Sequence, residues 1–471
     1  MNDITIVNMY FAEKDAEGKV GFIPLGPLYL AAILEKNGYH VDFRDYLVAG
    51  AQYKDPVDYR NILHFLQDSA DILAVGCSSC TLPITLFALE KLKALHPHKT
   101  FILGGIGPTG AAEEILTHFP FIDIIIRGEA EHTAVELLNR LESGRSLKDV
   151  RGISYREGER VIANPARERI KNLDELPFPA YHKIDVNNYT CTGLITARGC
   201  PFQCTFCDVA PFWGRNQYFK RSIDNVMAEV RLLTEAYGQK SINIFDETFP
   251  IERQRVSAFC QRIKENNADL QWTCSARISP MDKALLKEMK EAGCWMVFYG
   301  IESGSDHVLK CIKKGYNKKQ VEKIIAGSLE YMAVNAFFMW GFPFETMADF
   351  YETLDFVDHV SCLGVTPVVH ILNSLPLSAL YAEYKNSMTF HRELYENSLL
   401  LRHGEMVQLI EAYPQIFAAF YHCDANILHK YEIARQKGMA NNLITLDALG
   451  QEYASYYGQG QVKPGVYNGR I

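Results

Sequence analysis

Short apolar segments alternate with helical patterns along most of the chain, and this alternation constrains the fold more than any other feature. In the first part, the segments typical of buried parallel strands are 4–8, 41–45, 72–77, 101–104 and 122–127. The helical patterns between them cover 27–36, 59–68, 82–95, 111–118 and 131–141. This order predicts an α/β fold with a doubly wound, Rossmann-like sheet.

A second alternating run starts near residue 194. Its strand-like segments are 194–196, 241–245, 271–274, 296–300, 336–340 and 365–370. The helical stretches between them are 223–237, 254–267, 282–292, 318–331 and 347–359. These strands and helices predict a partial (β/α)6 barrel, and the active sites of such barrels lie at the carboxyl ends of the strands.

The remaining segments divide the chain into four parts. A β-hairpin is predicted near 152–162, and Pro177 and Pro179 require an extended chain after it. Apolar residues recur at helical spacing after residue 383, which indicates a mainly helical region that covers the barrel mouth. We therefore predict an N-terminal domain, a linker, a barrel and a C-terminal region, with the boundaries 1–145, 146–188, 189–382 and 383–471.

Three cysteines gather in the loop that follows the first barrel strand. Cys200, Cys204 and Cys207 have C-x3-C-x2-C spacing, and Gly199 and Pro201 favour a tight loop. Thiolates bind iron well, and this spacing lets one loop hold three corners of a single cubane. A structural zinc site would need four closed ligands. The alternative is three unrelated thiols in the core.

Polar residues at other strand ends of the second run are candidate ligands. Arg277 offers a fixed donor fork that suits a carboxylate, although a solvated surface arginine is the alternative. Asp246 is a second candidate, and an ion-pair network that includes Glu247 would explain it equally well. The turn at 341–346 is expected to be structural, with Thr346 as a helix cap.

Loops at the strand ends of the first run combine glycines with hydroxyl groups. Glycines permit close backbone approach, and hydroxyls can bind a polar ligand edge. A purely structural role is equally compatible with these loops alone. The residues concerned are Ser78, Ser79, Thr81, Gly104, Gly105, Pro108, Gly128 and Glu129.

The cysteine loop, with Phe206 before the third cysteine, resembles the C-x3-C-x-aromatic-C signature of the radical S-adenosylmethionine (SAM) superfamily. The G-I-E-S-G element at 300–304 matches the same family. The resemblance implies a [4Fe–4S] cluster on the three cysteines and SAM on its open iron, which yields a 5′-deoxyadenosyl radical. It also implies that Phe206 lies beside the adenine. Asp246, Arg277, Gly300, Glu302 and Ser303 are then the expected SAM-binding residues.

An α/β domain ahead of this core, ending in G-E-x-E at 128–131, is similar to the cobalamin-binding domain of cobalamin-dependent radical SAM enzymes. The resemblance implies that the eight strand-end residues named above line the corrinoid. Residues 10–14 lack the histidine that ligates cobalt in methionine-synthase-like modules, so no histidine is expected below the metal. The alternative is a domain of this shape that binds no corrinoid.

The implied activity is methylation of an unactivated carbon, in which one SAM methylates the corrinoid and another supplies the radical. A cyclase or ring-rearranging enzyme with the same cofactors is the alternative, and an iron–sulfur electron carrier without catalysis is a third hypothesis. The expected partners are a small-molecule substrate, or a peptide, and an external low-potential electron donor such as flavodoxin or ferredoxin.

Composition limits the other classes of partner. The formal net charge of −8 gives no basic footprint for nucleic acid. No apolar run approaches the ~20 residues that a membrane span needs. The sequence also lacks a signal-peptide pattern, which predicts a cytoplasmic protein whose 12 cysteines are thiols or metal ligands.

Overall fold

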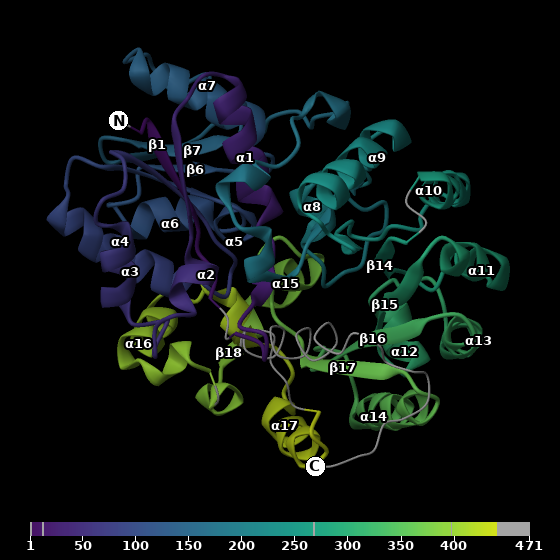
Figure 1. Cartoon of the computed structure of the whole chain (residues 1–471). Coiled ribbons are helices and arrows are strands. Elements are labelled where there is room, and N and C mark those ends of the chain that lie inside the picture. Colours follow the sequence, from purple (N-terminus) through teal and green to yellow (C-terminus); the bar gives the residue numbers. More distant parts are fainter. Residues whose placement is uncertain (1, 12–13, 267–268, 397, 440–471) are drawn as a thin grey trace.

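The computed structural model describes residues 2–11, 14–266, 269–396 and 398–439. An α/β domain (purple and blue) lies beside a curved sheet with its helices (teal and green), as Figure 1 shows. A C-terminal region (yellow) touches both. Residues 440–471 of the predicted C-terminal region lie outside the described residues, as do Ala12 and Glu13 of the loop that lacks a cobalt-ligating histidine.

The N-terminal domain has the predicted Rossmann-like parallel sheet. Its parallel strands run β3-β1-β4-β5-β6, and they are β1 (Ile4–Asn8), β3 (Val41–Asp45), β4 (Ile72–Gly76), β5 (Thr100–Gly104) and β6 (Ile124–Ile126). The covering helices are α1 (Leu25–Lys36), α2 (Tyr46–Gly50), α3 (Tyr59–Leu66), α4 (Leu82–Leu95), α5 (Ile106–Thr109), α6 (Ala112–His118) and α7 (Glu131–Glu142). The central strands are mainly apolar because helices cover both faces of the sheet.

The hairpin predicted for the linker belongs to this sheet. Its strands β7 (Ile153–Glu157) and β8 (Arg160–Ala163) pair antiparallel, and β7 also pairs antiparallel with β6. The sheet therefore has seven strands. Ile153 and Tyr155 are buried, so the hairpin extends the hydrophobic core of the domain.

The second sheet confirms the partial barrel. Its six parallel strands follow chain order: β10 (Gly193–Leu194), β13 (Ser241–Ile244), β14 (Gln271–Ala276), β15 (Cys294–Glu302), β16 (Ala333–Trp340) and β17 (Thr366–Ile371). The helices lie on its outer side in Figure 1, and they are α9 (Ile223–Arg231), α10 (Arg253–Asn266), α11 (Lys283–Glu291), α13 (Lys318–Leu329) and α14 (Met347–Cys362). The inner side faces the N-terminal domain.

The helix cap predicted at Thr346 is present. Its hydroxyl accepts a hydrogen bond from the backbone NH of Asp349 at 3.2 Å, and the Asp349 carboxylate accepts one from the backbone NH of Thr346 at 3.0 Å. This reciprocal capping box satisfies donors at the start of α14. The turn after β16 is therefore held by local hydrogen bonds.

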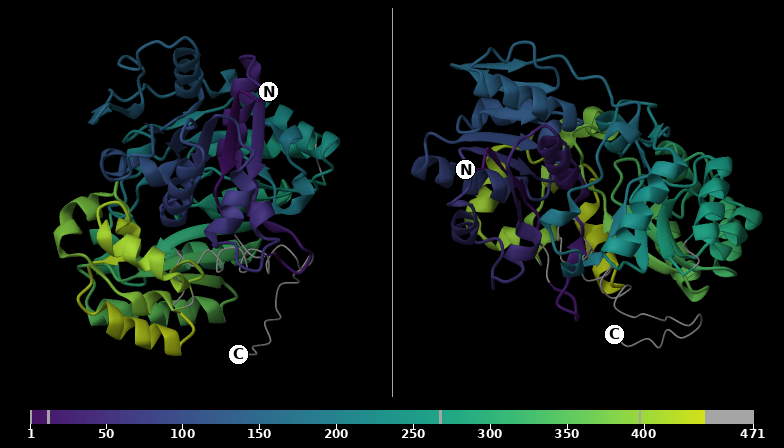
Figure 2. Two further views of the ribbon diagram at one scale, coloured as in Figure 1. Left: turned by 90° about the vertical axis from the view of Figure 1, so that its left-hand side faces the viewer. Right: turned by 45° about the horizontal axis from the view of Figure 1, so that its top comes forward.

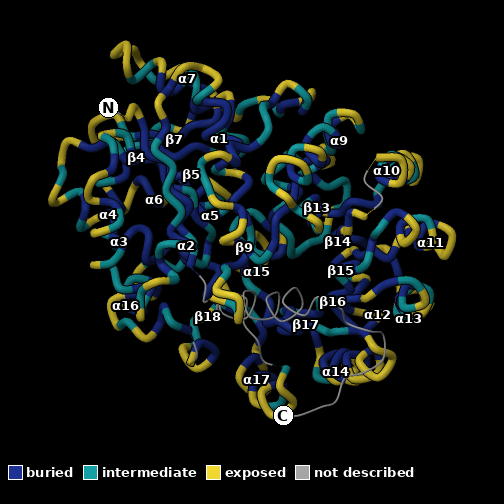
Figure 3. The backbone as a smooth tube through the Cα atoms, viewed as in Figure 1, coloured by how far each residue is buried: buried dark blue, intermediate teal, exposed yellow. Residues whose placement is uncertain are grey.

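The two sheets are joined by a short parallel pair that the sequence pattern did not predict. β2 (Val20–Phe22), from the N-terminal domain, pairs with β9 (Tyr189–Cys191) just before the barrel. Figure 3 shows buried backbone in both sheets and in this joining region, with exposed backbone mainly on the outer helices. The pairing places the start of α1 against the barrel interior.

The C-terminal region packs against both domains, as the left view of Figure 2 shows. Its helices are α15 (Ala379–Tyr384), α16 (Gly404–Ala412) and α17 (Ile427–Gln436). The rings of Tyr413 and Phe119 lie 5.0 Å apart, which joins it to the N-terminal domain. Lys430 Nζ lies 2.8 Å from Glu345 Oε2, which joins it to the turn after β16. No helix of the described residues is long and apolar enough to cross a bilayer.

His422 makes acid stability a test of this packing. Its ring is buried, with Nε2 2.7 Å from the hydroxyl of Tyr395 and Nδ1 3.1 Å from the carbonyl oxygen of Leu372. Burial lowers its pKa to about 3. Below pH ~6.5 the His422 ring binds a proton in the unfolded chain but stays neutral in the folded chain. Acid therefore lowers the free energy of unfolding through this group.

We expect the stability advantage of the wild type over His422→Asn to shrink by ~2 kcal/mol between pH 6.5 and pH 5. Urea unfolding of both proteins at several pH values measures this difference. An advantage that stays constant from pH 7.5 to pH 5 would contradict the buried, neutral imidazole.

Candidate active site

The three cysteines lie together in one loop between β11 (Ala197–Arg198) and α8 (Val209–Phe212). All three are free and partly buried. Gly199 has φ +95°, and a Cβ there would lie 2.2 Å from the backbone oxygen of Gln217, so the loop requires glycine. Across the described residues, no three His, Cys, Asp or Glu side chains could hold a single metal ion. A cubane spreads its thiolate ligands over separate corners, and three partly buried thiols on one loop fit that group.

Asp246 fixes the chain that enters the cysteine loop. Its carboxylate accepts hydrogen bonds from the backbone NH of Thr196 at 2.6 Å, from the Thr196 hydroxyl at 2.5 Å and from the backbone NH of Ala197 at 3.0 Å. Burial raises its pKa to about 6. Asp246 therefore links the end of β13 to the cysteine loop, and its contact with SAM stays a prediction.

Arg277 brings the end of β14 to the same loop. Its Nη1 lies 3.3 Å from Cys204 Sγ, and its Nη2 donates to the carbonyl of Lys314. The guanidinium lies 3.9 Å from the centroid of the Phe202 ring. Only 8% of Arg277 is exposed, so it is a buried cation beside the thiols rather than a solvated surface arginine.

Glu302 and Lys314 form a buried ion pair beside Phe206. Lys314 Nζ lies 3.0 Å from Glu302 Oε1 and 5.9 Å from the centroid of the Phe206 ring. Glu302 has φ +75°, an uncommon conformation for a residue with a side chain. Burial alone would lower the pKa of Lys314, but the Glu302 carboxylate raises it above its usual value. Lys314 carries no signal in the sequence pattern, because it lies beyond the helix that follows β15.

The other residues of the G-I-E-S-G element lie differently. Gly300 is partly buried, and its carbonyl accepts a hydrogen bond from the Tyr316 hydroxyl at 2.7 Å. Ser303 is fully buried, with its hydroxyl 2.8 Å from Thr353 Oγ1 on α14. Arg277, Glu302 and Phe206 therefore gather around the cysteine loop, while Ser303 faces a helix and its SAM contact stays a prediction.

The strand-end loops of the N-terminal domain pack tightly against one another. Gly105 has φ +98°, and a Cβ there would lie 2.9 Å from the carbonyl oxygen of Cys77. A Cβ on Gly104 would meet nothing within 4 Å, so backbone is open to a ligand there. The Ser78 backbone NH donates to Thr81 Oγ1 at 3.2 Å. Three further members of this predicted set are Ser79 and Pro108, which are buried, and Gly128, which is partly buried with φ +74°.

Two contacts place these loops against the barrel. A Cβ on Gly128 would lie 4.0 Å from the carbonyl oxygen of Phe212, just after the cysteine loop. A Cβ on Gly110 would lie 2.9 Å from the Cβ of Pro376, in the turn after β17. The Glu129 carboxylate also pairs with Arg198 on β11 and with Arg169 from the linker. Its predicted corrinoid contact stays a prediction.

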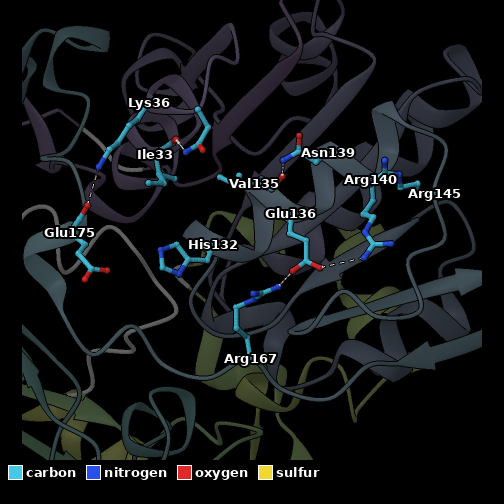
Figure 4. Close-up of a pocket in the computed structure, with 11 residues that line it drawn as sticks. Ile33, Lys36, His132, Val135, Glu136, Asn139, Arg140, Arg145, Arg167 and Glu175 are labelled. Carbon is cyan, nitrogen blue, oxygen red and sulfur yellow. Dashed lines mark hydrogen bonds and ion pairs between the residues drawn. The ribbon is translucent and has the colours of Figure 1, made fainter.

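The structure has a groove on the N-terminal domain and a cavity inside the barrel. A groove of about 600 Å³ between α1 and α7 holds no predicted site residue, and its Arg140 and Arg167 both pair with Glu136 (Figure 4). The second cavity, of about 310 Å³, lies on the inner side of the barrel. Its walls include Phe22 at the end of the joining strand β2, Ile23 after it, and the barrel residues Asn243, Ser275 and Phe298. The smaller cavity is thus the one that both domains enclose.

Comparison with known proteins accounts for both halves of this arrangement. The family model of the radical SAM superfamily matches residues 194–357, and that of the B12 binding domain matches residues 17–138. The chain therefore contains a radical SAM domain preceded by a B12 binding domain, the combination found in cobalamin-dependent radical SAM enzymes. Solved structures with this fold contain cobalamin together with a [4Fe–4S] cluster or with SAM.

Three of the proteins similar to this chain are enzymes with different named activities. An uncharacterized methyltransferase of Pyrococcus horikoshii is 28% identical over 84% of this chain and 87% of its own length. An anaerobic magnesium-protoporphyrin IX monomethyl ester cyclase of Synechocystis is 27% identical over 73% of this chain and 70% of its own length. The radical SAM methyltransferase TsrM of Kitasatospora setae shares the fold, with a TM-score of 0.69, 15% identity and coverage of 97% and 95%.

Proposed function

We propose that this radical SAM enzyme methylates an unactivated carbon of a small molecule. The observation that carries the proposal is the juxtaposition of the cysteine loop with the strand-end loops of the B12-binding domain. Gly128 lies against Phe212, just after the loop, so the two cofactor regions meet at one interface. The similar methyltransferase of Pyrococcus horikoshii supports the choice of reaction.

Within this proposal, Cys200, Cys204 and Cys207 hold the [4Fe–4S] cluster. The buried Arg277 donates to Cys204 Sγ, and such hydrogen bonds to cluster sulfurs tune the reduction potential. Glu302 offers an anion and Arg277 a cation, which match the charges of an amino-acid zwitterion such as the methionine end of SAM. When bound, the cluster with SAM supplies the radical and the corrinoid supplies the methyl group.

The corrinoid is held by the loops after β4, β5 and β6. Open space around Gly104 lets a flat ligand approach the backbone, and hydroxyl groups nearby suit its polar edge. The cavity of about 310 Å³ on the inner side of the barrel, which Phe22 and Phe298 line, is largely apolar. Such a lining excludes water from a reactive radical. We infer that the enzyme works in the cytoplasm, where flavodoxin or ferredoxin supplies the electron. A peptide is the alternative substrate class.

A second candidate is a cyclase or ring-rearranging reaction with the same cofactors and no methyl transfer. The similarity to the Synechocystis cyclase favours keeping this alternative. The two reactions differ in their products. Methylation adds one CH2 unit to the substrate and leaves S-adenosylhomocysteine, whereas cyclisation does neither.

Anaerobic reconstitution of the full chain with iron, sulfide and hydroxocobalamin tests the proposal. After reduction with methyl-labelled SAM, we expect bound corrinoid, 5′-deoxyadenosine and S-adenosylhomocysteine, with label in a product from a metabolite extract. Deoxyadenosine without S-adenosylhomocysteine or a labelled product would favour the cyclase. A reduced cluster that never cleaves SAM would point to an electron carrier and reject both reactions.

A further inference from the structure

A buried network of charges connects the B12-binding domain to the cysteine loop. It consists of Glu129, Glu131, Arg169 and Arg198, and we call it the Glu–Arg network. Arg198 Nη1 lies 3.1 Å from Glu129 Oε1, and Arg198 Nη2 lies 2.6 Å from Glu131 Oε1. Arg169 Nε lies 2.8 Å from Glu129 Oε2. The four side chains are 5–8% exposed, so solvent screens these pairs little.

The network joins three separate parts of the chain. Glu129 and Glu131 follow β6 in the N-terminal domain, beside Gly128 at the predicted corrinoid edge. Arg169 comes from the linker, whose Ile170 backbone NH also donates to Glu129 Oε2 at 2.9 Å. Arg198 lies on β11, two residues before Cys200. The first and last of these segments carry the two proposed cofactor sites.

The network also reaches the other end of the cysteine loop. The guanidinium groups of Arg169 and Arg198 lie 4.8 and 5.7 Å from the ring of Trp213, which follows the third cysteine. Arg169 Nη1 donates to the carbonyl of Trp213, and Trp213 Nε1 donates to Glu247 Oε1 at 2.8 Å. Both ends of the loop are therefore fixed to the same group of charges.

The chemistry of the network suits a rigid connection. Two carboxylates face two guanidinium groups, so the buried charges balance. Arg198 uses its two terminal nitrogens for two different glutamates, which the single ammonium of lysine could not reproduce with the same geometry. Burial would raise the pKa of Glu131, but Arg198 holds it below its usual value, so the pair stays ionised at neutral pH.

We propose that the Glu–Arg network consists of positioning residues that set the distance between the cysteine loop and the corrinoid-binding loops. The inference rests on the proposed function, because it concerns the separation of that reaction's two cofactors. Those cofactors lie on different domains, and a misplacement of about 1 Å can cost a reaction ~100-fold. The network holds the two sites together without touching the reacting atoms.

Hydrogen exchange of the apoprotein tests the connection without any cofactor. Arg198→Gln should speed exchange about tenfold or more in both 126–131 and 197–207, because it frees the two segments from each other. Arg167→Gln is the matched control, since it removes an arginine of the same linker region that pairs with Glu136 on α7 and does not touch the loop. It should leave 197–207 at the wild-type rate.

The loaded full chain gives the second readout. When dithionite reduces the cluster and leaves cobalamin in the Co(II) state, their magnetic interaction in electron paramagnetic resonance reports their separation. Arg198→Gln should weaken or broaden this interaction at unchanged iron and corrinoid content. Arg198→Lys should lie between Arg198→Gln and the wild type. Glu131→Gln keeps the ion pair between Arg198 and Glu129, so it should weaken the magnetic interaction less than Arg198→Gln does. It replaces Arg198→Gln in the test if that variant does not fold.

The proposal would be overturned if residues 126–131 and 197–207 exchanged at the wild-type rate in both Arg198→Gln and Glu131→Gln. A magnetic interaction that these substitutions leave unchanged would overturn it too, as would an Arg167→Gln control that matches Arg198→Gln. If the wild type binds no corrinoid, the proposed function fails, while the exchange measurement still decides whether the network connects the two segments.

Discussion

Cys204→Ala is expected to reduce SAM cleavage to background while corrinoid binding persists. Cys204 is the middle cysteine of the loop, and without it only two thiolates remain to hold the cluster. The substitution also removes the acceptor of the Arg277 Nη1 hydrogen bond. The corrinoid loops belong to a different sheet and make no use of this thiol. Iron content, deoxyadenosine and the corrinoid absorption spectrum, measured on one preparation, check the prediction.

Cys362→Ala is the matched control for this experiment. Cys362 is an exposed cysteine at the end of α14, so its loss should change neither iron content nor SAM cleavage. Because Cys204 is only partly buried, the unfolding free energy of its apoprotein variant should stay within about 1 kcal/mol of the wild type. Loss of corrinoid together with iron would show that the two cofactor sites are not separable as proposed.

Lys430→Met is expected to destabilise the fold by ~3–5 kcal/mol, because it removes one partner of a buried ion pair. Lys430 is fully buried on α17, and its Nζ lies 2.8 Å from Glu345 Oε2 and 2.5 Å from Asp424 Oδ2. Methionine keeps most of the volume and leaves two carboxylates without their cation. Urea unfolding at pH 8.5 gives the effect directly.

The pH dependence of the Lys430→Met effect has a definite sign. Burial raises the pKa of Glu345 to about 7 even beside Lys430, and removal of the cation raises it further. The folded chain retains a proton that the unfolded chain loses near pH 4.5, so stability falls from there as pH rises; the wild type levels off near pH 7, whereas the variant continues to lose stability above it. The destabilisation should be larger at pH 8.5 than at pH 6.

Lys437→Met serves as the control, at the residue that caps the C-terminus of the same helix. Lys437 pairs with Asp358 at 2.9 Å, but its side chain is 39% exposed, so its loss should cost less than ~1 kcal/mol. Equal effects of the two substitutions would mean that the C-terminal region is not fastened to the barrel through Lys430.

Periodicity in the sequence predicted the long, self-contained elements well. The segment 4–8 and the helix 82–95 coincide with β1 and α4, because apolar residues and a proline near the helix start define them locally. The pairing of β2 with β9 could not be predicted, since three-residue strands carry no measurable period. The partner of the hairpin was missed for a related reason: pairing with β6 depends on burial of Ile153 and Tyr155 in a core that only the folded domain provides.

In the candidate site, too, the local motif could be predicted from the sequence, and contacts between distant residues could not. The cysteines and Phe206 lie in one local motif, so their spacing alone indicates the chemistry. Contacts between distant residues were not predictable: Glu129 and Arg198 are 69 positions apart, and Lys314 reaches Glu302 only after the chain has passed through a further helix. The roles of Asp246 and Glu129 in binding cofactors remain predictions, because in the structure their carboxylates bind other parts of the protein.

The central claim is that the cysteine loop holds a four-iron cluster with one open iron, next to a corrinoid on the preceding domain. Electron paramagnetic resonance of the anaerobically reconstituted and reduced full chain tests it most directly. We predict a [4Fe–4S]+ signal that shifts when SAM is added and that interacts with cob(II)alamin in the same sample. A protein that retains no iron would contradict the account, and a cluster signal that neither SAM nor the corrinoid alters would contradict its assignment of the site.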